Sequence, residues 1–383
     1  MMVAGIDPGT RTMDLIVMDD EKNRIVYGEA IDRDMITRDP SIPIKRLRDL
    51  RREYNIQSIT APSGYGIPLK SVQEASIEEI LEATFIHRED CIRRLKIVGL
   101  RRLMMLFRNS NLPAWFSPGV IHLPTVPRYR KINRIDLGTA DKIYTVAAAM
   151  VNARQRYKLR PGDISMLVVE SGQAYNAAIL VENGEIVDGI GGTMAWWGLM
   201  GGGFIDSETC YALSYTVPGF SKILLFQGGV STFSGYISYD EIEKDLERNE
   251  IRAVEALKVI TESITKTIAP LIAVSSTKPI LYLSGRLYRH PRIQQSVYTS
   301  IKNNDSLRTK IRDIVFLEST DTKIKAAAMG AAYIASGVAG GKYSWIIDTL
   351  KLDKSQGSIF DYIEPKEYAL KIKDTFTRAS EDC

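Results

Sequence analysis

Three short segments of the chain combine an acidic or hydroxyl side chain with a glycine. They are Asp7-Pro8-Gly9-Thr10, Glu170-Ser171-Gly172-Gln173 and Ser284-Gly285-Arg286. Glycine lets backbone N–H groups approach an anion closely, and successive N–H groups in a turn form an anion-binding nest. A carboxylate would repel phosphate, so its natural role beside such a nest is to hold Mg²⁺ or the waters around the ion. The chemistry that these residues indicate is the binding of a nucleotide triphosphate.

The elements that must position these turns recur in the same order in two parts of the chain. The first part predicts strands over Met2–Ile6, Met13–Met18 and Arg24–Ile31. The second predicts strands over Ile164–Val169, Asn176–Glu182 and Glu185–Ile190, with Asn183-Gly184 as a type I′ hairpin turn. An acid-x-glycine turn follows the first strand of each set. This repetition predicts an α/β protein with two duplicated domains, and a nucleotide clamped in the cleft between them.

Small residues mark two of the predicted helices. These are Thr139–Arg156 and Thr322–Ser336, and the second is expected to end at Gly337 as a C-cap. Small side chains let helices pack closely, so ordinary core packing and a crossed pair at a domain junction both remain open. A long amphipathic helix is predicted within Tyr239–Val274, where Pro270 should end or kink it.

Length and composition limit the function classes. A chain of 383 residues suits two domains, which we place at 1–155 and 156–340, with an insertion around 191–240 and a packed tail over 341–383. The 50 lysine and arginine residues nearly balance the 46 aspartate and glutamate residues, so charge alone does not favour nucleic-acid binding. Three cysteines without CxxC spacing make a cysteine zinc site improbable. No segment has the apolar length of a membrane span or the pattern of a signal peptide, so we expect a cytoplasmic protein.

Five blocks of the sequence resemble, in order, the motifs of the actin-like ATPase superfamily, which includes sugar and acetate kinases, heat-shock chaperones and actin. Gly5–Thr10 resembles its first phosphate motif, Val169–Gln173 its second, and Leu283–Leu287 its adenosine motif. Asp136–Lys142 and Ala326–Gly337 are similar to its two connecting helices. Within the superfamily, the sequence is most similar to an archaeal family of unknown function that is labelled predicted butyrate kinase.

The resemblance implies two ribonuclease-H-like domains with ATP and Mg²⁺ in the cleft. It implies a metal role for Asp7 and Glu170 and catalytic roles for Asp7, Asp136 and Lys142. Asp136 matches an aspartate near the transferred phosphoryl group, and Lys142 lies near a position where acetate kinases have a histidine. The residues implied in nucleotide binding are Gly9, Thr10, Arg11, Glu170, Ser171, Gly172, Gln173, Gly285 and Arg286. The chain departs from acetate kinases in having one glycine in the second phosphate turn and none of their active-site histidines.

Three further groups are substrate candidates, each with an alternative interpretation. Ser63 and Gly64 follow a predicted strand and would line a substrate pocket, or form an ordinary loop. Arg101 and Arg128 would bind a carboxylate through a bidentate fork, or belong to a solvated surface. Gly192 and Thr193 lie in a segment rich in glycine and tryptophan, which would approach a ligand or pack as an irregular loop.

These observations predict an ATP-dependent kinase whose acceptor is a small carboxylate or hydroxyl compound. One alternative is a nucleotide-dependent switch or sensor ATPase that acts through a protein partner. Another is a degenerate member that binds nucleotide poorly. The expected partner is a small-molecule substrate, with no nucleic acid and no membrane, and the resemblance to acetate kinases adds a homodimer as an expectation.

Overall fold

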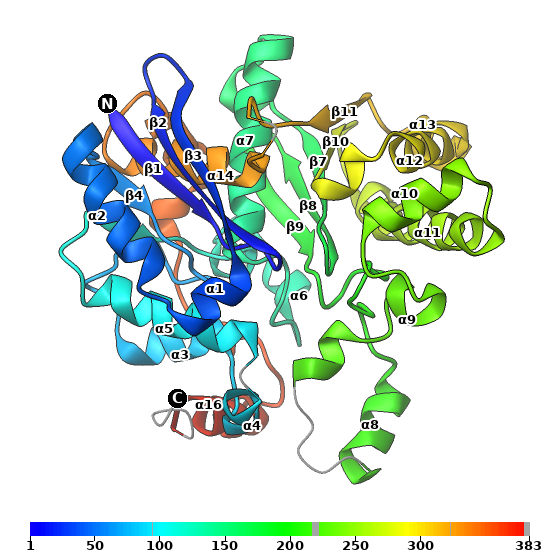
Figure 1. Cartoon of the computed structure of the whole chain (residues 1–383), viewed down its shortest axis with the longest axis horizontal. Helices are drawn as coiled ribbons and strands as arrows, with labels where there is room; N and C mark the ends of the chain where they lie inside the picture. Colours follow the sequence, from blue (N-terminus) through cyan, green and yellow to red (C-terminus); the bar gives the residue numbers. More distant parts are fainter. Residues whose placement is uncertain (94, 217–221, 322, 379–383) are drawn as a thin grey trace. The chain divides into compact units, whose positions relative to one another are not determined.

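The predicted strands form two sheets, and the chain divides by its internal contacts into two units. The computed structural model describes residues 1–93, 95–216, 222–321 and 323–378 (Figure 1). Unit 1 comprises Met1–Ile164, Val181–Asp188 and Leu317–Cys383, and unit 2 comprises Ser165–Leu180 and Gly189–Phe316. The boundaries predicted for the duplicated domains, and the cleft between them, stay predictions.

The sheet of unit 1 has six strands in the order β3-β2-β1-β4-β6-β5. The strands are β1 (Met2–Asp7), β2 (Thr12–Asp19), β3 (Arg24–Asp32), β4 (Ser58–Thr60), β5 (Lys70–Ser71) and β6 (Ala114–Phe116). The first three form an antiparallel meander, whereas β4 runs parallel to β1 and β6 runs parallel to β4. The carboxyl ends of β1, β4 and β6 therefore meet at one edge of the sheet.

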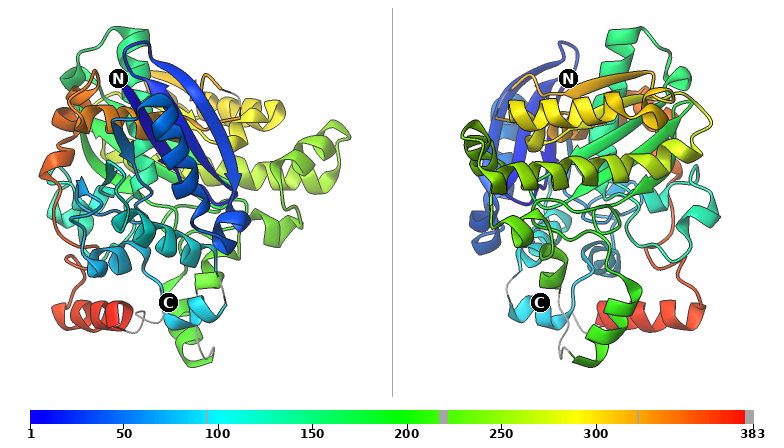
Figure 2. Two further views of the ribbon diagram at one scale, coloured as in Figure 1. Left: turned by 60° about the vertical axis from the view of Figure 1, so that its left-hand side comes forward. Right: turned by 90° about the vertical axis from the view of Figure 1, so that its right-hand side faces the viewer.

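One face of this sheet carries the main hydrophobic core of unit 1. Ala4, Ile6, Met13 and Leu15 point into it, because alternate residues of a strand share a face. The helices that supply the other side of the core are α1 (Arg33–Arg38), α2 (Ile42–Tyr54), α3 (Ile77–Thr84) and α5 (Lys96–Arg108), and Figure 2 shows α2 lying across the strands. Alternation then places Gly5 and Asp7 on the opposite face.

The opposite face is covered by α14 (Ala326–Val338), and α7 (Ala140–Tyr157) packs against α14 (Figure 1). A Cβ atom on Gly5 would lie 2.3 Å from the carbonyl oxygen of Ala328, and one on Gly330 would lie 1.7 Å from that of Tyr144. Glycine at these two positions lets α14 approach both the sheet and α7. The close packing predicted from the small residues is therefore present within unit 1.

The predicted C-cap at Gly337 is wrong. Helix α14 continues through this residue to Val338, and the left-handed conformation is adopted instead by Gly340, with φ of 73°. A Cβ atom on Gly337 would lie 2.8 Å from Ile347 in α15 (Ser344–Leu350). The glycine therefore makes room for a neighbouring helix rather than ending its own.

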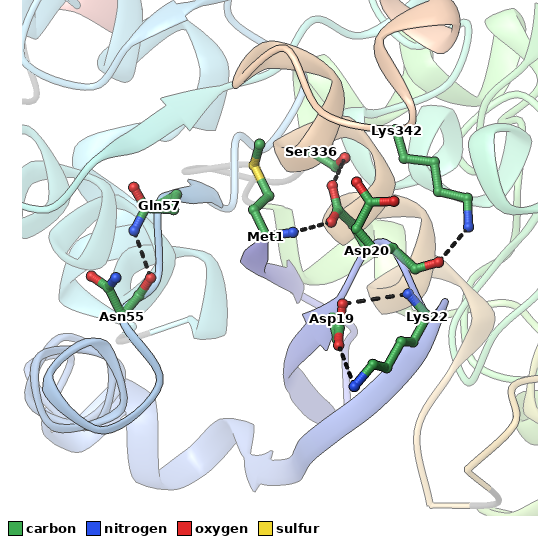
Figure 3. A network of polar contacts seen from close by, with 9 residues as sticks. Met1, Asp19, Asp20, Lys22, Asn55, Gln57, Ser336 and Lys342 are labelled. Atoms are coloured by element: carbon green, nitrogen blue, oxygen red, sulfur yellow. Dashed lines mark hydrogen bonds and ion pairs between the residues drawn. The ribbon is translucent and has the colours of Figure 1, made fainter.

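Polar contacts tie α14 to both ends of β2. At the carboxyl end of the helix, Ser336 Oγ donates to Asp20 Oδ2 over 2.6 Å, and Met1 N also contacts Asp20 (Figure 3). Burial opposes the charged form of Asp20, but these two donors outweigh it and hold its pKa below the ordinary value. At the amino end of the helix, Lys325 N donates to Asp14 Oδ2 over 2.9 Å. These anchors fix the position of Lys325.

The second sheet repeats the pattern of the first. Its order is β11-β10-β7-β8-β9, in which β9-β8-β7-β10 corresponds to β3-β2-β1-β4. The strands are β7 (Met166–Ser171), β8 (Asn176–Glu182), β9 (Glu185–Ile190), β10 (Ile280–Ser284) and β11 (Asp313–Leu317), and β10 is parallel to β7. Asn183 and Gly184 have φ values of 51° and 83°, as the predicted type I′ turn requires. The predicted duplication is confirmed.

The helices of unit 2 correct one prediction. The expected single helix within residues 239–274 is two, α10 (Tyr239–Glu247) and α11 (Ile251–Val274), separated at Asn249 with φ of 55°. Pro270 does not end α11, because the proline falls near the end of the helix and little of the helix remains to be disrupted. Both helices pack against α12 (Pro291–Asn303), and α11 and α12 run side by side in Figure 2.

The remaining elements of the described residues are short or peripheral. The other α-helices are α4 (Arg88–Ile92), α6 (Arg128–Lys131), α8 (Ser207–Thr216), α9 (Val230–Ser234), α13 (Asp305–Arg308) and α16 (Lys366–Arg378). The 3₁₀ helices are Val120–His122, Pro161–Asp163, Lys222–Phe226, Arg286–Arg289 and Leu352–Lys354. Within the described ranges, every helix is too short or too polar to cross a membrane.

Candidate functional site

A polar cluster lies at the sheet edge where β1, β4 and β6 end in unit 1. Ser63 follows β4 and Ser117 follows β6, and Ser117 N donates to Ser63 Oγ over 2.9 Å. The hydroxyl of Tyr144, in α7, donates to Ala61 O over 3.0 Å. Burial raises the pKa of Tyr144, and the charges of Asp141 and Asp7 raise it further. A neutral tyrosine therefore joins the end of β4 to the start of α7.

The segment that leads into α7 packs on the loop that follows β4. Ala140 N donates to Gly64 O over 3.1 Å, so the two segments are in direct contact. Asp136 is buried, and its Oδ1 accepts a hydrogen bond from Gly138 N over 3.0 Å. The predicted catalytic segment and the predicted substrate loop, Ser63 and Gly64, are thus brought together at one place.

Asp141 and Lys142 lie in the first turn of α7. Lys142 Nζ is 2.7 Å from Asp141 Oδ2, and Thr139 Oγ1 also donates to this carboxylate. Burial alone would raise the pKa of Asp141, but Lys142, Thr139 and the charge of Lys325 outweigh it and lower the pKa. The carboxylate is therefore ionised at neutral pH and holds Lys142 at the amino end of the helix.

Asp7 lies at the end of β1 and is only 1% exposed. It pairs with Asp14 across β1 and β2, so both side chains are on the face covered by α14. Lys325 engages both residues, since its ammonium forms an ion pair with Asp7 Oδ2 and its backbone N–H donates to Asp14. Neither Asp14 nor Lys325 is among the site residues predicted from the sequence. The available signals were an isolated acid within an apolar strand and a lysine just before a run of alanines.

Arg33 is a third residue that the sequence analysis missed. It follows β3, and its side chain, 4% exposed, donates from Nη2 to Lys96 O over 3.2 Å. Burial lowers the pKa of Arg33 to about 10, while the nearby carboxylate of Asp7 opposes this shift. The guanidinium therefore keeps its charge at neutral pH and is a second cation close to Asp7.

This donor set does not fit a divalent metal ion on Asp7 as it stands. Both carboxylate oxygens of Asp7 are buried, and the ammonium of Lys325 lies against one of them. Among the residues that the structure describes, no group of three or more histidine, cysteine, aspartate or glutamate side chains could hold a metal ion. The ion pair with Lys325 therefore competes with a metal ion for Asp7, and the predicted metal role of Glu170 stays a prediction.

In unit 2 the second phosphate turn and the predicted adenosine turn touch each other. Glu170 and Ser284 are in register on the parallel strands β7 and β10. Gly285 has φ of 117°, and a Cβ atom there would lie 2.2 Å from Ser171 O. The glycine is therefore explained by the approach of the two turns. The predicted nucleotide-binding residues of unit 2 lie close to one another.

Gly172 behaves differently from Gly285. A Cβ atom on Gly172 would meet only Tyr175 O, at 3.7 Å, so the fold leaves room for a side chain. Gly172 N donates to Tyr175 O over 3.0 Å, and Gly172 O accepts from the hydroxyl of Tyr239 over 3.0 Å. The backbone of this turn is thus rigidly held, while the space beside its Cα is open to a ligand.

The segment rich in glycine and tryptophan packs around Tyr175. A Cβ atom on Gly192 would lie 2.8 Å from the tyrosine side chain, and one on Gly201 would lie 2.3 Å from its ring. The hydroxyl of Tyr175 donates to Leu225 O over 2.9 Å. This geometry favours the packed-loop interpretation of Gly192 and Thr193, although the loop lies beside the second phosphate turn.

The two arginine candidates make their contacts elsewhere. Arg101 is buried and donates to Thr84 Oγ1 over 2.9 Å and to Ile86 O over 3.3 Å, so it connects α5 to the end of α3. Arg128 is largely exposed, and its Nη2 lies 3.4 Å from Glu364 Oε1. Neither contact involves the polar cluster of unit 1.

The family of the chain follows from its sequence as a whole. Residues 5–365 match the model of a family described as "Protein of unknown function (DUF1464)". The chain belongs to this family. No curated protein matches it.

Solved structures show the fold. The chain is similar to a propionate kinase from Francisella tularensis subsp. tularensis SCHU S4, with a TM-score of 0.59, 13% identity, and coverage of 86% of this chain and 98% of that one. It is also similar to the Porphyromonas gingivalis acetate kinase, with a TM-score of 0.61, 11% identity, and coverage of 87% and 98%. It is similar as well to the Entamoeba histolytica acetate kinase, with a TM-score of 0.56, 14% identity, and coverage of 85% of this chain and 94% of that one. The chain therefore shares the fold of these kinases, a mixed α/β fold with two similar sheets, as predicted.

Proposed function

We propose that the protein is an ATP-dependent phosphotransferase that acts on a small molecule. The acceptor that we favour is a short-chain carboxylate such as butyrate, with a hydroxyl compound second. The observation that carries the proposal is the cluster at the sheet edge of unit 1, where the segment that contains Asp136 and Lys142 packs on the Ser63 loop through the hydrogen bond from Ala140 N to Gly64 O. Ligands of open α/β sheets bind at this edge. The shared fold with acetate and propionate kinases supports the reaction class.

The reaction requires little covalent chemistry from the protein. An acceptor oxygen attacks the terminal phosphorus of ATP, the bond to the bridging oxygen breaks, and ADP leaves. Phosphoryl transfer through a loose transition state depends on positioning and on charge stabilisation. Lys142, at the amino end of α7, would supply positive charge. Asp136 would orient a carboxylate acceptor, or accept the proton of a hydroxyl acceptor.

The remaining expectations belong to the same proposal. Gly9, Thr10 and Arg11 of unit 1 and the turns around Gly172 and Gly285 of unit 2 would contact the nucleotide. Magnesium would enter the site bound to the phosphates of ATP. No step assigned to this chain requires Asp7 to hold the ion. A cytoplasmic location and a homodimer remain part of the proposal.

The test is acceptor-dependent release of ADP from the purified protein. We expect turnover with at least one member of a panel of acetate, propionate, butyrate, glycerol and glucose. Asp136→Asn should lower kcat about 100-fold, because a misplaced acceptor costs a factor of this size, while the affinity for ATP stays within threefold. Asp163→Asn, a change in a surface ion pair of unit 1, is the matched control and should retain full activity. ATP binding without any acceptor-dependent ADP release would favour the nucleotide-dependent switch instead.

A further inference from the structure

We infer that the ammonium of Lys325 serves as the cation of the first phosphate turn. It pairs with Asp7 in the place of a divalent metal ion, and it binds the phosphates of the nucleotide directly. The inference deepens the proposed function and rests on it for the identity of the ligand. It assigns to this one lysine a role that the sequence motifs do not mark. Its consequence is that ATP binds with little dependence on a divalent cation.

The position of Lys325 is imposed by its backbone. The residue precedes α14 directly, and its N–H donates to Asp14 Oδ2, so the start of the helix is fixed against β2. The side chain then extends to the carboxylate at the end of β1, where its ammonium pairs with Asp7. Only 14% of the side chain is exposed, so the ammonium is largely withdrawn from bulk water.

The ammonium of Lys325 also lies directly beside the phosphate turn. A Cβ atom on Gly9 would lie 2.2 Å from Lys325 Nζ, so the space that a side chain would take at Gly9 belongs to this cation. A phosphate that enters the turn and approaches the Gly9 backbone must therefore meet the ammonium. A lysine ammonium in contact with a phosphate would supply the charge for which other proteins use a metal.

The surrounding charges favour the ammonium of Lys325 over a divalent metal ion beside Asp7. Asp7, Asp14 and Asp141 face Lys325, and Arg33 and Lys142 supply further positive charge to the same cluster. These three carboxylates and three cations balance. A divalent ion on Asp7 would have to displace the Lys325 ammonium and break its ion pair with Asp7. A buried ion pair adds little to stability on its own, so its location at the turn argues for a function.

The first experiment titrates Mn²⁺ against the nucleotide-free protein and follows the free ion by electron paramagnetic resonance. We expect Lys325→Met to bind one Mn²⁺ at least tenfold more tightly than the wild type, because the Asp7 carboxylate becomes accessible. The double variant Lys325→Met, Asp7→Asn should lose this gain. Lys323→Met, an exposed lysine two residues earlier, is the matched control and should behave as the wild type. Equal Mn²⁺ affinity in the wild type and Lys325→Met would overturn the inference.

The second experiment measures the binding of a non-hydrolysable ATP analogue by calorimetry, with excess EDTA and with excess Mg²⁺. The wild type should bind within threefold under both conditions, and Lys325→Met should bind at least tenfold more weakly in EDTA. A wild type that binds only with Mg²⁺ would contradict the role of Lys325 and leave the proposed function standing. A folded wild type that binds under neither condition would overturn the proposed function, and the phosphate-binding role of Lys325 with it.

Discussion

Replacing Gly330 by alanine should lower the midpoint of thermal unfolding by roughly 6–12 °C. The added Cβ atom would lie 1.7 Å from the carbonyl oxygen of Tyr144, which belongs to the backbone of α7 and cannot rotate away. The two helices must therefore separate, and overpacking of this kind costs about 3 kcal/mol. For a folding unit of about 150–250 residues, the range into which unit 1 falls, 1 kcal/mol corresponds to about 2–4 °C.

The control for this prediction is Gly162→Ala. Gly162 lies in the 3₁₀ helix Pro161–Asp163, and no atom lies within 4 Å of the position that its Cβ would take. Its melting point should stay within about 1 °C of the wild type. If Gly330→Ala had the same midpoint of thermal unfolding as Gly162→Ala, then α7 and α14 would have to lie further apart than they do in this structure. Since α7 carries Lys142 and the start of α14 positions Lys325, that result would also undermine the site.

Acidification from pH 6.5 to pH 4 should lower the free energy of unfolding by about 3 kcal/mol through His122 alone. The imidazole is buried, and its Nδ1 accepts a hydrogen bond from Gly119 N over 3.2 Å. Burial lowers the pKa of His122 to about 4, whereas the unfolded chain has the ordinary value of 6.5. Between these pH values only the unfolded state binds the proton. The stability from this residue is therefore complete above pH 6.5 and is lost as the pH falls.

Urea unfolding at a series of pH values measures this slope, and His122→Gln should flatten it because glutamine can accept the same hydrogen bond without titrating. His87→Gln, which changes a helix N-cap elsewhere in unit 1, should leave the slope unchanged. Asp20, Asp141 and Glu79 have lowered pKa values, so their contributions also begin to be lost toward the acidic end of this window and remain in His122→Gln. A slope in His122→Gln that is as steep as in the wild type would contradict the assignment.

Much of the fold could be predicted from local signals. The hairpin turn at Asn183 and Gly184 could be predicted because both residues readily adopt the positive φ values that the turn requires. The duplication was visible because apolar runs and acid-x-glycine turns recur in the same order. The break at Asn249 was missed because the hydrophobic stripe continues across it, and asparagine in the left-handed conformation has no strong sequence signal.

The candidate site was predictable only in part. Asp7, Asp136 and Lys142 stand in recognisable motifs, and the structure gives each of them a buried or helix-terminal environment. Lys325 is separated from Asp7 by more than 300 residues, and only the packing of α14 on β1 and β2 brings them together. The ligand-binding interpretation of Arg101 could not be weighed against a structural role until its hydrogen bonds to Thr84 and Ile86 were known.

The most direct test of the nucleotide-binding claim is calorimetric titration of the folded protein with a non-hydrolysable ATP analogue, repeated on Gly172→Ala. The wild type should bind with a dissociation constant below 1 mM, by analogy with typical substrate affinities of ~1 μM to 1 mM. Gly172→Ala should bind at least fivefold more weakly with an unchanged melting point, because the fold has room for the methyl group and only a ligand would meet it. No detectable binding by the folded wild type would contradict the account.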